Sequence, residues 1–270
     1  MMAVLIFTIL ILTIYLISAA VIYFKQDSFV YRPGHEIFRF PSDEGMDFED
    51  IDIHTIDGEK LNAWYIPAGK NSCGKTVLFC HGNAGSLSHR IETLKLIHSL
   101  GLSVLIFDYR GYGISTGMPS EDGIITDAEA AYAYLLKNIE PDETRIIIWG
   151  RSLGGPVAAK LASEHNASVC ILESTFTSLP DIAAYRFKLF PGKLLCRYRF
   201  PTIEYVSKID MPLLVVHSLE DEIIPYRMGK ELFRAASEPK EFLEIHGSHN
   251  DCYFESEAEY RAGLIAVLQH

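Results

Sequence analysis

The stretch Ile146-Ile147-Ile148-Trp149-Gly150-Arg151-Ser152-Leu153-Gly154-Gly155 decides the fold of this chain. Its apolar first half is typical of a buried strand, and a helix of small residues begins directly after it. Ser152 lies in the turn between them, in the pattern Gly-x-Ser-x-Gly. This pattern is typical of a nucleophile elbow, a sharp strand-to-helix turn that exposes one hydroxyl at the end of a sheet. Gly150 and Gly154 flank the serine because a Cβ atom there would collide with backbone in so tight a turn.

Length and composition limit the classes of function. A chain of 270 residues suits one α/β domain with a sizeable core and a short extension. The 35 Asp and Glu residues outnumber the 24 Lys and Arg residues, so the net charge is -11 and nucleic acid is a disfavoured partner. The five cysteines match no zinc or disulfide pattern, and we expect them to be reduced and mostly buried.

The motifs that bind common cofactors are missing. Gly111-x-Gly113 has Thr116 where a dinucleotide fingerprint needs its third glycine. The sequence also lacks a Gly-Lys-Ser/Thr phosphate loop, a His-Glu-x-x-His motif and paired Cys-x-x-Cys motifs. We therefore expect no cofactor and no metal.

The first segment is long and apolar enough to cross a membrane. Residues 3–24 carry no charge, and 22 residues rise about 33 Å as a helix. The competing interpretation is a cleaved signal peptide, for which Ser18-Ala19-Ala20 offers small residues at a cleavage site. The run is long for a signal peptide and no Lys or Arg precedes it, so we expect a retained transmembrane anchor.

The basic residues near this segment all follow it: Lys25, Arg32 and Arg39. The positive-inside rule then predicts a single-pass membrane protein whose large domain, residues 25–270, lies on the cytoplasmic side.

Beyond the anchor, strands and helices alternate. Residues 27–45 read as irregular chain, and residues 48–56 and 61–66 as a hairpin turning at Asp57-Gly58. Strands are expected at 76–80, 102–107, 145–149, 169–172, 212–216 and 241–245, and helices follow near 91–100, 121–135, 227–236 and 257–268. Such alternation predicts an α/β fold with a mostly parallel sheet and helices on both faces, whose functional groups lie at the carboxyl ends of the strands.

A serine hydroxyl is a weak nucleophile, which needs a base to take its proton and an acid to orient that base. Asp221 lies in the loop after strand 212–216, and His249 lies in the loop after strand 241–245. Ser152, Asp221 and His249 therefore occur in the order that the elbow pattern requires, each just past a strand end. His246 is the rival base, expected to be packed against the strand end, and Glu220 and Glu222 are the rival acids.

An oxyanion needs two N–H donors. One is expected from the backbone of Leu153, the residue after the nucleophile. The other is expected from Asn83, in the loop His81-Gly82-Asn83-Ala84-Gly85 that follows strand 76–80. The alternative interpretation of that loop is an ordinary glycine-rich turn into a helix.

With these motifs in place, the chain resembles the α/β-hydrolase fold, and more narrowly its membrane-anchored branch of depalmitoylase-like and serine-aminopeptidase-like hydrolases. The resemblance is carried by Phe29-Val30-Tyr31-Arg32-Pro33, His81-Gly82-Asn83-Ala84-Gly85, Asp108-Tyr109-Arg110-Gly111-Tyr112-Gly113, Gly150-Arg151-Ser152-Leu153-Gly154-Gly155, Asp221-x-x-Ile224-Pro225 and Gly247-x-His249-Asn250-Asp251. It implies that the segment from Asp108 to Gly113 is a structural loop beside the site.

In this fold, material inserted after the sixth strand often covers the site, and residues 174–210 fill that place. Five basic residues mix with aromatic residues in 185–190 and 193–200. We expect this lid to rest on the membrane surface; the alternative is that its aromatic residues pack on the sheet and its cations are solvated.

The sequence thus predicts a membrane-anchored serine hydrolase that cleaves a carboxylic ester or thioester, with small-molecule, lipid or acylated substrates. The alternatives are a serine peptidase or amidase on the same fold and a non-catalytic scaffold.

Overall fold

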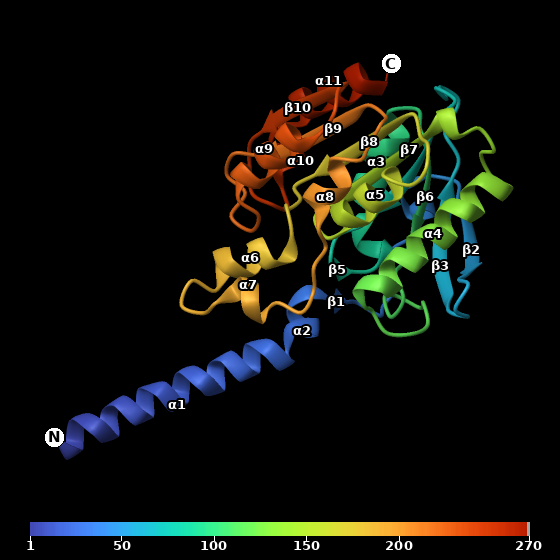
Figure 1. The fold of residues 1–270 in the computed structure, drawn as a ribbon. Coiled ribbons are helices and arrows are strands. Elements are labelled where there is room, and N and C mark those ends of the chain that lie inside the picture. The colour runs from blue at the N-terminus through green and yellow to red at the C-terminus, as the bar shows by residue number, and fades with distance from the viewer. Residues whose placement is uncertain (269–270) are drawn as a thin grey trace.

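The computed structural model describes residues 1–268 and places an eight-stranded sheet at the centre of these residues (Figure 1). The strand order is β10-β9-β8-β7-β4-β6-β3-β2. The strands are β2 (Glu49–His54), β3 (Lys60–Ile66), β4 (Thr76–Cys80), β6 (Ser103–Phe107), β7 (Ile146–Arg151), β8 (Val169–Glu173), β9 (Leu213–Ser218) and β10 (Lys240–Ile245). Along this order, the six strands from β10 to β6 all pair in parallel with their neighbours. Strand β3 pairs antiparallel with both β2 and β6. A separate two-stranded sheet joins β1 (Arg32–Pro33) to β5 (Ala84–Gly85).

The burial of each strand follows its sequence. Every residue of β4, β6, β8 and β9 is buried, as expected of continuous apolar runs covered on both faces. In β2, at the edge, only Ile51 and Ile53 are buried, which matches the alternating pattern of the sequence. The turn at Asp57-Gly58 forms the predicted hairpin, with Gly58 at a φ of +92°.

Helices cover both faces of the sheet. One apolar layer is formed with α4 (Glu121–Asn138), α5 (Gly154–Ala162) and α9 (Tyr226–Ala235), and the other with α3 (Ile91–Ser99) and α11 (Glu257–Leu268). The smaller elements are η1 (Pro41–Glu44), η2 (Leu87–Arg90), η3 (Glu143–Arg145) and α10 (Cys252–Glu255). Ser120 caps α4, because its side chain accepts the backbone N–H of Gly123. The predicted α/β fold is confirmed.

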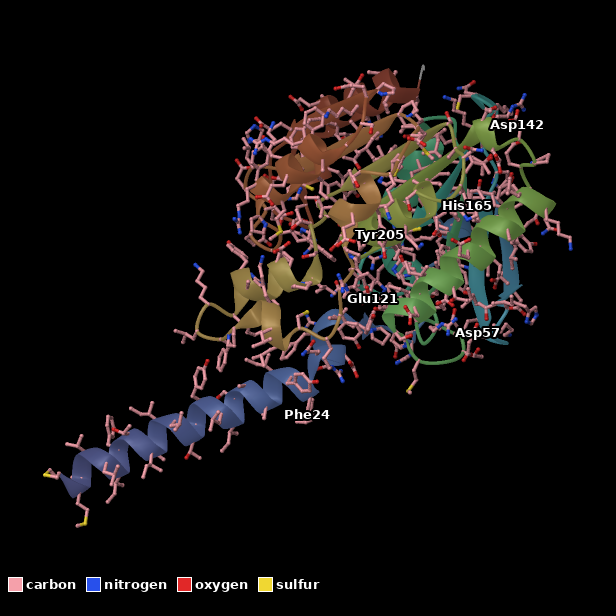
Figure 2. The ribbon with its side chains drawn as sticks, viewed as in Figure 1. Phe24, Asp57, Glu121, Asp142, His165 and Tyr205 are labelled. Carbon is pink, nitrogen blue, oxygen red and sulfur yellow. The ribbon has the colours of Figure 1, made fainter. Side chains whose placement is uncertain are left out.

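The N-terminal helix α1 (Met2–Phe24) extends away from this body (Figure 1). None of its residues is buried, and among residues 1–268 it is the one helix long and apolar enough to cross a membrane. Figure 2 shows its side chains projecting on all sides, with Phe24 at the end nearest the body.

Residues 174–210 form three short helices, α6 (Leu179–Arg186), α7 (Gly192–Leu195) and α8 (Thr202–Val206). Helices α6 and α7 pack on each other beside α1, whereas α8 packs on α5 and α9 in the body. The insertion meets the body again at Arg199 and Phe200. Their N–H groups donate to the carboxylate of Glu121 in α4 (2.7 Å and 2.5 Å), which Figure 2 labels. The part of this insertion that stands off the sheet is therefore α6–α7.

One predicted segment is wrong. Residues 27–45 are not irregular throughout, because they contain part of α2 (Gln26–Val30), β1 and η1. The Gln26 amide donates to the carbonyl of Leu195 (2.6 Å) and accepts the N–H of Arg197 (2.8 Å). These contacts link residues about 170 positions apart in the chain. A five-residue helix held by such partners leaves no local periodic pattern to detect.

Candidate active site

Ser152 follows β7 at a φ of +55°, a left-handed backbone conformation that is uncommon for residues other than glycine. The two glycines around it are sterically required. A Cβ atom on Gly154 would lie 1.9 Å from the carbonyl oxygen of Cys80, and one on Gly150 would lie 2.2 Å from the carbonyl oxygen of Gly154. The turn therefore holds the serine in a strained, fixed conformation at the end of the sheet.

Three of the predicted site residues meet in one hydrogen-bonded chain. The Nε2 atom of His249 lies 3.2 Å from the Ser152 hydroxyl, and its Nδ1 atom lies 2.7 Å from Oδ2 of Asp221. The other carboxylate oxygen of Asp221 accepts the backbone N–H groups of Ile223 (2.9 Å) and Ile224 (2.7 Å). The carboxylate is thereby fixed, and it fixes the imidazole ring in turn.

The surroundings keep Asp221 ionised. Burial by itself would raise the pKa of Asp221, but the hydrogen bond and positive charge of His249 and the N–H of Ile224 outweigh it and hold this pKa below its usual range. Behind the carboxylate, Nε2 of His217 lies 3.5 Å from Oδ2 of Asp221. Burial lowers the pKa of His217, which favours its neutral form. The carboxylate of Asp221, buried beside the neutral imidazole of His217, is thus suited to orient His249 as a base.

The two predicted oxyanion donors flank the serine. Gly82 precedes Asn83 and approaches Ser152 so closely that a Cβ atom on it would lie 3.5 Å from the serine Cβ. The side chain of Asn83 is turned away and donates to the carbonyl of Val30 (3.1 Å). Within residues 1–268, the backbone N–H groups of Asn83 and Leu153 have no protein acceptor. Both remain available to bind an oxyanion.

The loop after β6 supports the candidate oxyanion loop, residues 81–85. The hydroxyl of Tyr109 donates to the carbonyl of His81 (3.0 Å), and the hydroxyl of Tyr112 donates to the carbonyl of Asn83 (2.9 Å). Asp108 is fully buried with its Oδ1 atom 3.4 Å from Nε2 of His81. These contacts agree with a structural role for the loop.

The rival base and acids have other partners. The side chain of His246 is 64% exposed and pairs with Glu220 (2.9 Å), so the expectation that His246 is packed is wrong. His246 directly follows β10, but its ring points outward to the carboxylate of Glu220 rather than into the core. Glu222 accepts the backbone N–H of His249 (3.0 Å) and so shapes the loop that holds the imidazole.

A residue inside the elbow motif, Arg151, was not singled out from the sequence. Its Nη2 atom donates to the carbonyls of His249 (2.8 Å) and Asn250 (3.3 Å). Its Nε atom pairs with Glu173 at the end of β8 (3.2 Å). Arg151 thus ties the loop that carries the imidazole to the strand that precedes the serine.

Glu173 completes a buried polar network. Its carboxylate accepts the indole N–H of Trp149 (3.2 Å) and the hydroxyl of Tyr260 (2.7 Å). Burial by itself lowers the pKa of Arg151, but the charge of Glu173 reverses the shift and raises the pKa above its ordinary value. The sequence signal was a charged residue at the end of each of two apolar strands, Arg151 and Glu173. Such residues are expected to form a buried ion pair once the two strands are known to be neighbours in the sheet.

A cleft of about 610 Å³ leads from Ser152 and His249 toward α6 and the end of α1. Its apolar walls come from α1, α2, α6 and the segment after α6: Ile22, Phe29, Leu179, Ile182, Phe187 and Phe190. Four arginines also line it: Arg32, Arg90, Arg151 and Arg186. Among residues 1–268, no cluster of three His, Cys, Asp or Glu side chains is arranged to hold a metal ion.

Comparison with known proteins identifies the family. A family model described as "alpha/beta hydrolase fold" matches residues 75–195. The alpha/beta hydrolase domain-containing protein WAV2 of Arabidopsis thaliana is 38% identical over 233 residues, which cover 79% of this chain and 76% of that protein. The chain belongs to the alpha/beta hydrolase family.

Two further comparisons place this alpha/beta hydrolase among its relatives. Lysophosphatidylserine lipase ABHD12 of Danio rerio is 31% identical over 255 residues, which cover 79% of this chain and 65% of that protein. The solved structure of the Pyrococcus furiosus esterase Pf2001 is similar in fold, with a TM-score of 0.75 and 23% identity over 89% of this chain and 97% of that one. The α/β-hydrolase fold expected from the motifs is confirmed.

Proposed function

We propose that the protein is a membrane-anchored serine hydrolase that cleaves a carboxylic ester or thioester. The observation that carries this proposal is the hydrogen-bonded chain of Ser152, His249 and Asp221 at the end of an apolar cleft. Membership of a hydrolase family supports it independently.

In this mechanism the Ser152 hydroxyl attacks the substrate carbonyl while His249 takes its proton. Asp221 holds the imidazole in the required orientation and stabilises the imidazolium. The backbone N–H groups of Asn83 and Leu153 bind the oxyanion of the tetrahedral intermediate. His249 then donates its proton to the leaving group, which leaves the acyl group on the Ser152 oxygen. Water attacks this acyl-enzyme while His249 takes its proton, and His249 returns that proton to the Ser152 oxygen as the acid is released.

The proposed domains are an anchor at residues 3–24 and a catalytic domain at residues 25–270, with the lid at about 174–210. No residue of α1 is buried, which supports membrane insertion, because an apolar helix with little protein cover needs lipid around it. Lys25, Arg32 and Arg39 support a cytoplasmic catalytic domain.

The lid lies against the proposed anchor. The ring of Phe190 stacks on Tyr15 with centroids 4.9 Å apart. Tyr15 lies nine residues before Phe24, roughly 14 Å along the helix at 1.5 Å per residue. A membrane surface that crosses α1 near Phe24 would therefore also cover the tip of the lid. Leu189 and Leu194 in that region are 84% and 82% exposed, which supports contact with lipid.

These features favour an acylated substrate that enters from the membrane. The apolar part of the cleft is walled by the anchor end and the lid, so an acyl chain could pass from lipid to Ser152 without crossing water. The printed name of the relative from Danio rerio, a lysophosphatidylserine lipase, supports a lipid ester in particular.

The test is a matched set of oleoyl substrates, an ester, a thioester and an amide, offered to the full chain in lipid nanodiscs. We expect ester or thioester hydrolysis that falls at least a thousandfold in Ser152→Ala. Preferential amide cleavage would favour a peptidase or amidase instead. A folded wild-type chain that hydrolyses none of the three would favour a scaffold.

A further inference from the structure

Arg90 is one of the four arginines that line the cleft, and the proposed mechanism gives it no role. Arg90 ends η2, directly after the oxyanion loop in sequence, and lines the same cleft as Ser152. Among the residues that the structure describes, only Nη2 of its three guanidinium nitrogens has a partner, the carbonyl of Ala84 in that loop. Within residues 1–268, Nε is inaccessible to solvent and has no acceptor.

The charge of Arg90 is also unpaired. Among residues 1–268, no Asp or Glu forms an ion pair with it, whereas Arg151 is paired with Glu173. The acidic group with the largest effect on it is Asp108, which is buried beside His81 and forms no ion pair with Arg90. Burial, followed by the positive charge of Arg151, lowers the pKa of Arg90 to about 10. A guanidinium remains protonated at neutral pH, so the protein holds a cation without an ion-pair partner in the cleft that Ser152 also lines.

A half-buried cation with free donors is a favourable place for an anion. Arginine presents its N–H groups in a planar fork that matches phosphate and carboxylate oxygens. Such groups form charge-assisted hydrogen bonds, which are stronger in a cleft shielded from water. The remaining walls of the cleft are largely apolar and come from the anchor and the lid. One cleft thus combines a surface for an acyl chain with a cationic group near the oxyanion loop.

We propose that Arg90 forms an anion subsite, so that the preferred substrate is an acyl ester whose leaving group carries a phosphate or carboxylate. The inference rests on the proposed function only in placing the substrate carbonyl at Ser152. The acyl chain would then extend between α2, α6 and the anchor end, and the anionic leaving group would lie toward Arg90. A neutral ester would leave the charge of Arg90 without a counter-ion in the cleft.

The test measures binding, so that it does not depend on turnover. The full chain carrying Ser152→Ala, in mild detergent, is titrated calorimetrically with 1-hexanoylglycerol, 1-hexanoylglycerol 3-phosphate and hexanoyl glycerate. The first is neutral, the second carries a phosphate and the third a carboxylate on the same acyl chain. We expect the phosphate ester to bind about 10 to 100 times more tightly than the neutral ester. Tight binding of the carboxylate ester as well assigns the subsite to anions in general, and weak binding narrows it to phosphate.

Adding Arg90→Gln should reduce the preference for the phosphate ester to less than about threefold, and Arg90→Lys should retain part of it. The matched control is Arg145→Gln, which removes the same charge from an exposed position outside the cleft and should leave the preference unchanged.

Three results would overturn the anion subsite: equal or no binding of the neutral and phosphate esters, a preference that survives Arg90→Gln, or an equal loss of both ligands in that variant. The last result would reduce Arg90 to a support for the Ala84 loop. Because the Ser152→Ala chain turns nothing over, a failure of the serine mechanism would be seen in the hydrolysis assay and would not alter this binding result.

Discussion

Replacing Arg151 with methionine should destabilise the protein and displace its candidate base. The side chain of Arg151 is 13% exposed and that of Glu173 is 2% exposed, so the pair is almost fully buried. Removing one partner of a buried pair costs about 3–5 kcal/mol, because the other charge stays buried without compensation. Trp149 and Tyr260 still donate to Glu173, which places the cost near the lower end of that range.

For a domain of this size, each kcal/mol lowers Tm by roughly 2–4 °C. We therefore expect Arg151→Met to lower Tm by roughly 10 °C. The full chain is heated in mild detergent and its tryptophan fluorescence is followed; Trp149 lies in the network and reports on it directly. Arg151→Lys keeps a positive charge for Glu173 and should recover part of the loss.

The same variant should lower kcat more than it raises KM for a short-chain ester. Arg151 holds the carbonyls of His249 and Asn250, so its loss frees the loop that positions the imidazole and leaves the apolar walls of the cleft in place.

The double variant Arg151→Met/Glu173→Leu separates the ion pair from simple packing. Its Tm should fall by clearly less than the sum of the two single changes, because no unpaired charge remains buried. A Tm for Arg151→Met within 2 °C of the wild type, or strictly additive losses in the double variant, would refute the buried-pair account.

Three further predictions concern a glycine of the elbow, a buried histidine and two exposed leucines. Gly154→Ala should prevent folding, since its Cβ would lie 1.9 Å from a carbonyl oxygen, whereas Gly69→Ala, with its nearest contact at 3.4 Å, should yield folded protein by circular dichroism. Burial lowers the pKa of His217, so below about pH 6.5 the unfolded chain binds a proton more readily than the folded chain. Tm should therefore fall on acidification from pH 7.5 to 5.5, and it should fall less steeply in His217→Gln. An identical slope of Tm against pH in the variant would contradict this. Leu189→Asp/Leu194→Asp should slow hydrolysis of a vesicle-borne ester about tenfold but leave a soluble short-chain ester unaffected, and equal rates on both substrates would argue against a lid in contact with lipid.

The sheet and the convergence of Ser152, Asp221 and His249 follow from local sequence patterns. Buried parallel strands are continuous apolar runs, and their carboxyl ends lie at one edge of the sheet, so residues just past those ends come together. The glycines of the elbow are predictable for a similarly local reason, because the tight turn leaves no room for a Cβ atom.

The features that sequence patterns did not predict depend on distant partners. Helix α2 is held by Gln26 through contacts with the lid, and Arg151 pairs with Glu173 across neighbouring strands. The outward ring of His246 depends on Glu220, in a loop 26 residues away in the chain. Periodicity and capping rules describe neighbours along the chain, and such pairs become visible only when the strand order is known.

The central claim is that Ser152 is an activated nucleophile, and labelling with a fluorophosphonate probe tests it most directly. The folded full chain is treated in detergent and in vesicles, digested, and the modified peptide is identified by mass, with Ser152→Ala of unchanged Tm as the control. The account predicts one adduct, on the peptide that contains Ser152, and none in the variant. Labelling that survives Ser152→Ala, or a folded wild type that stays unlabelled in both media, would contradict it.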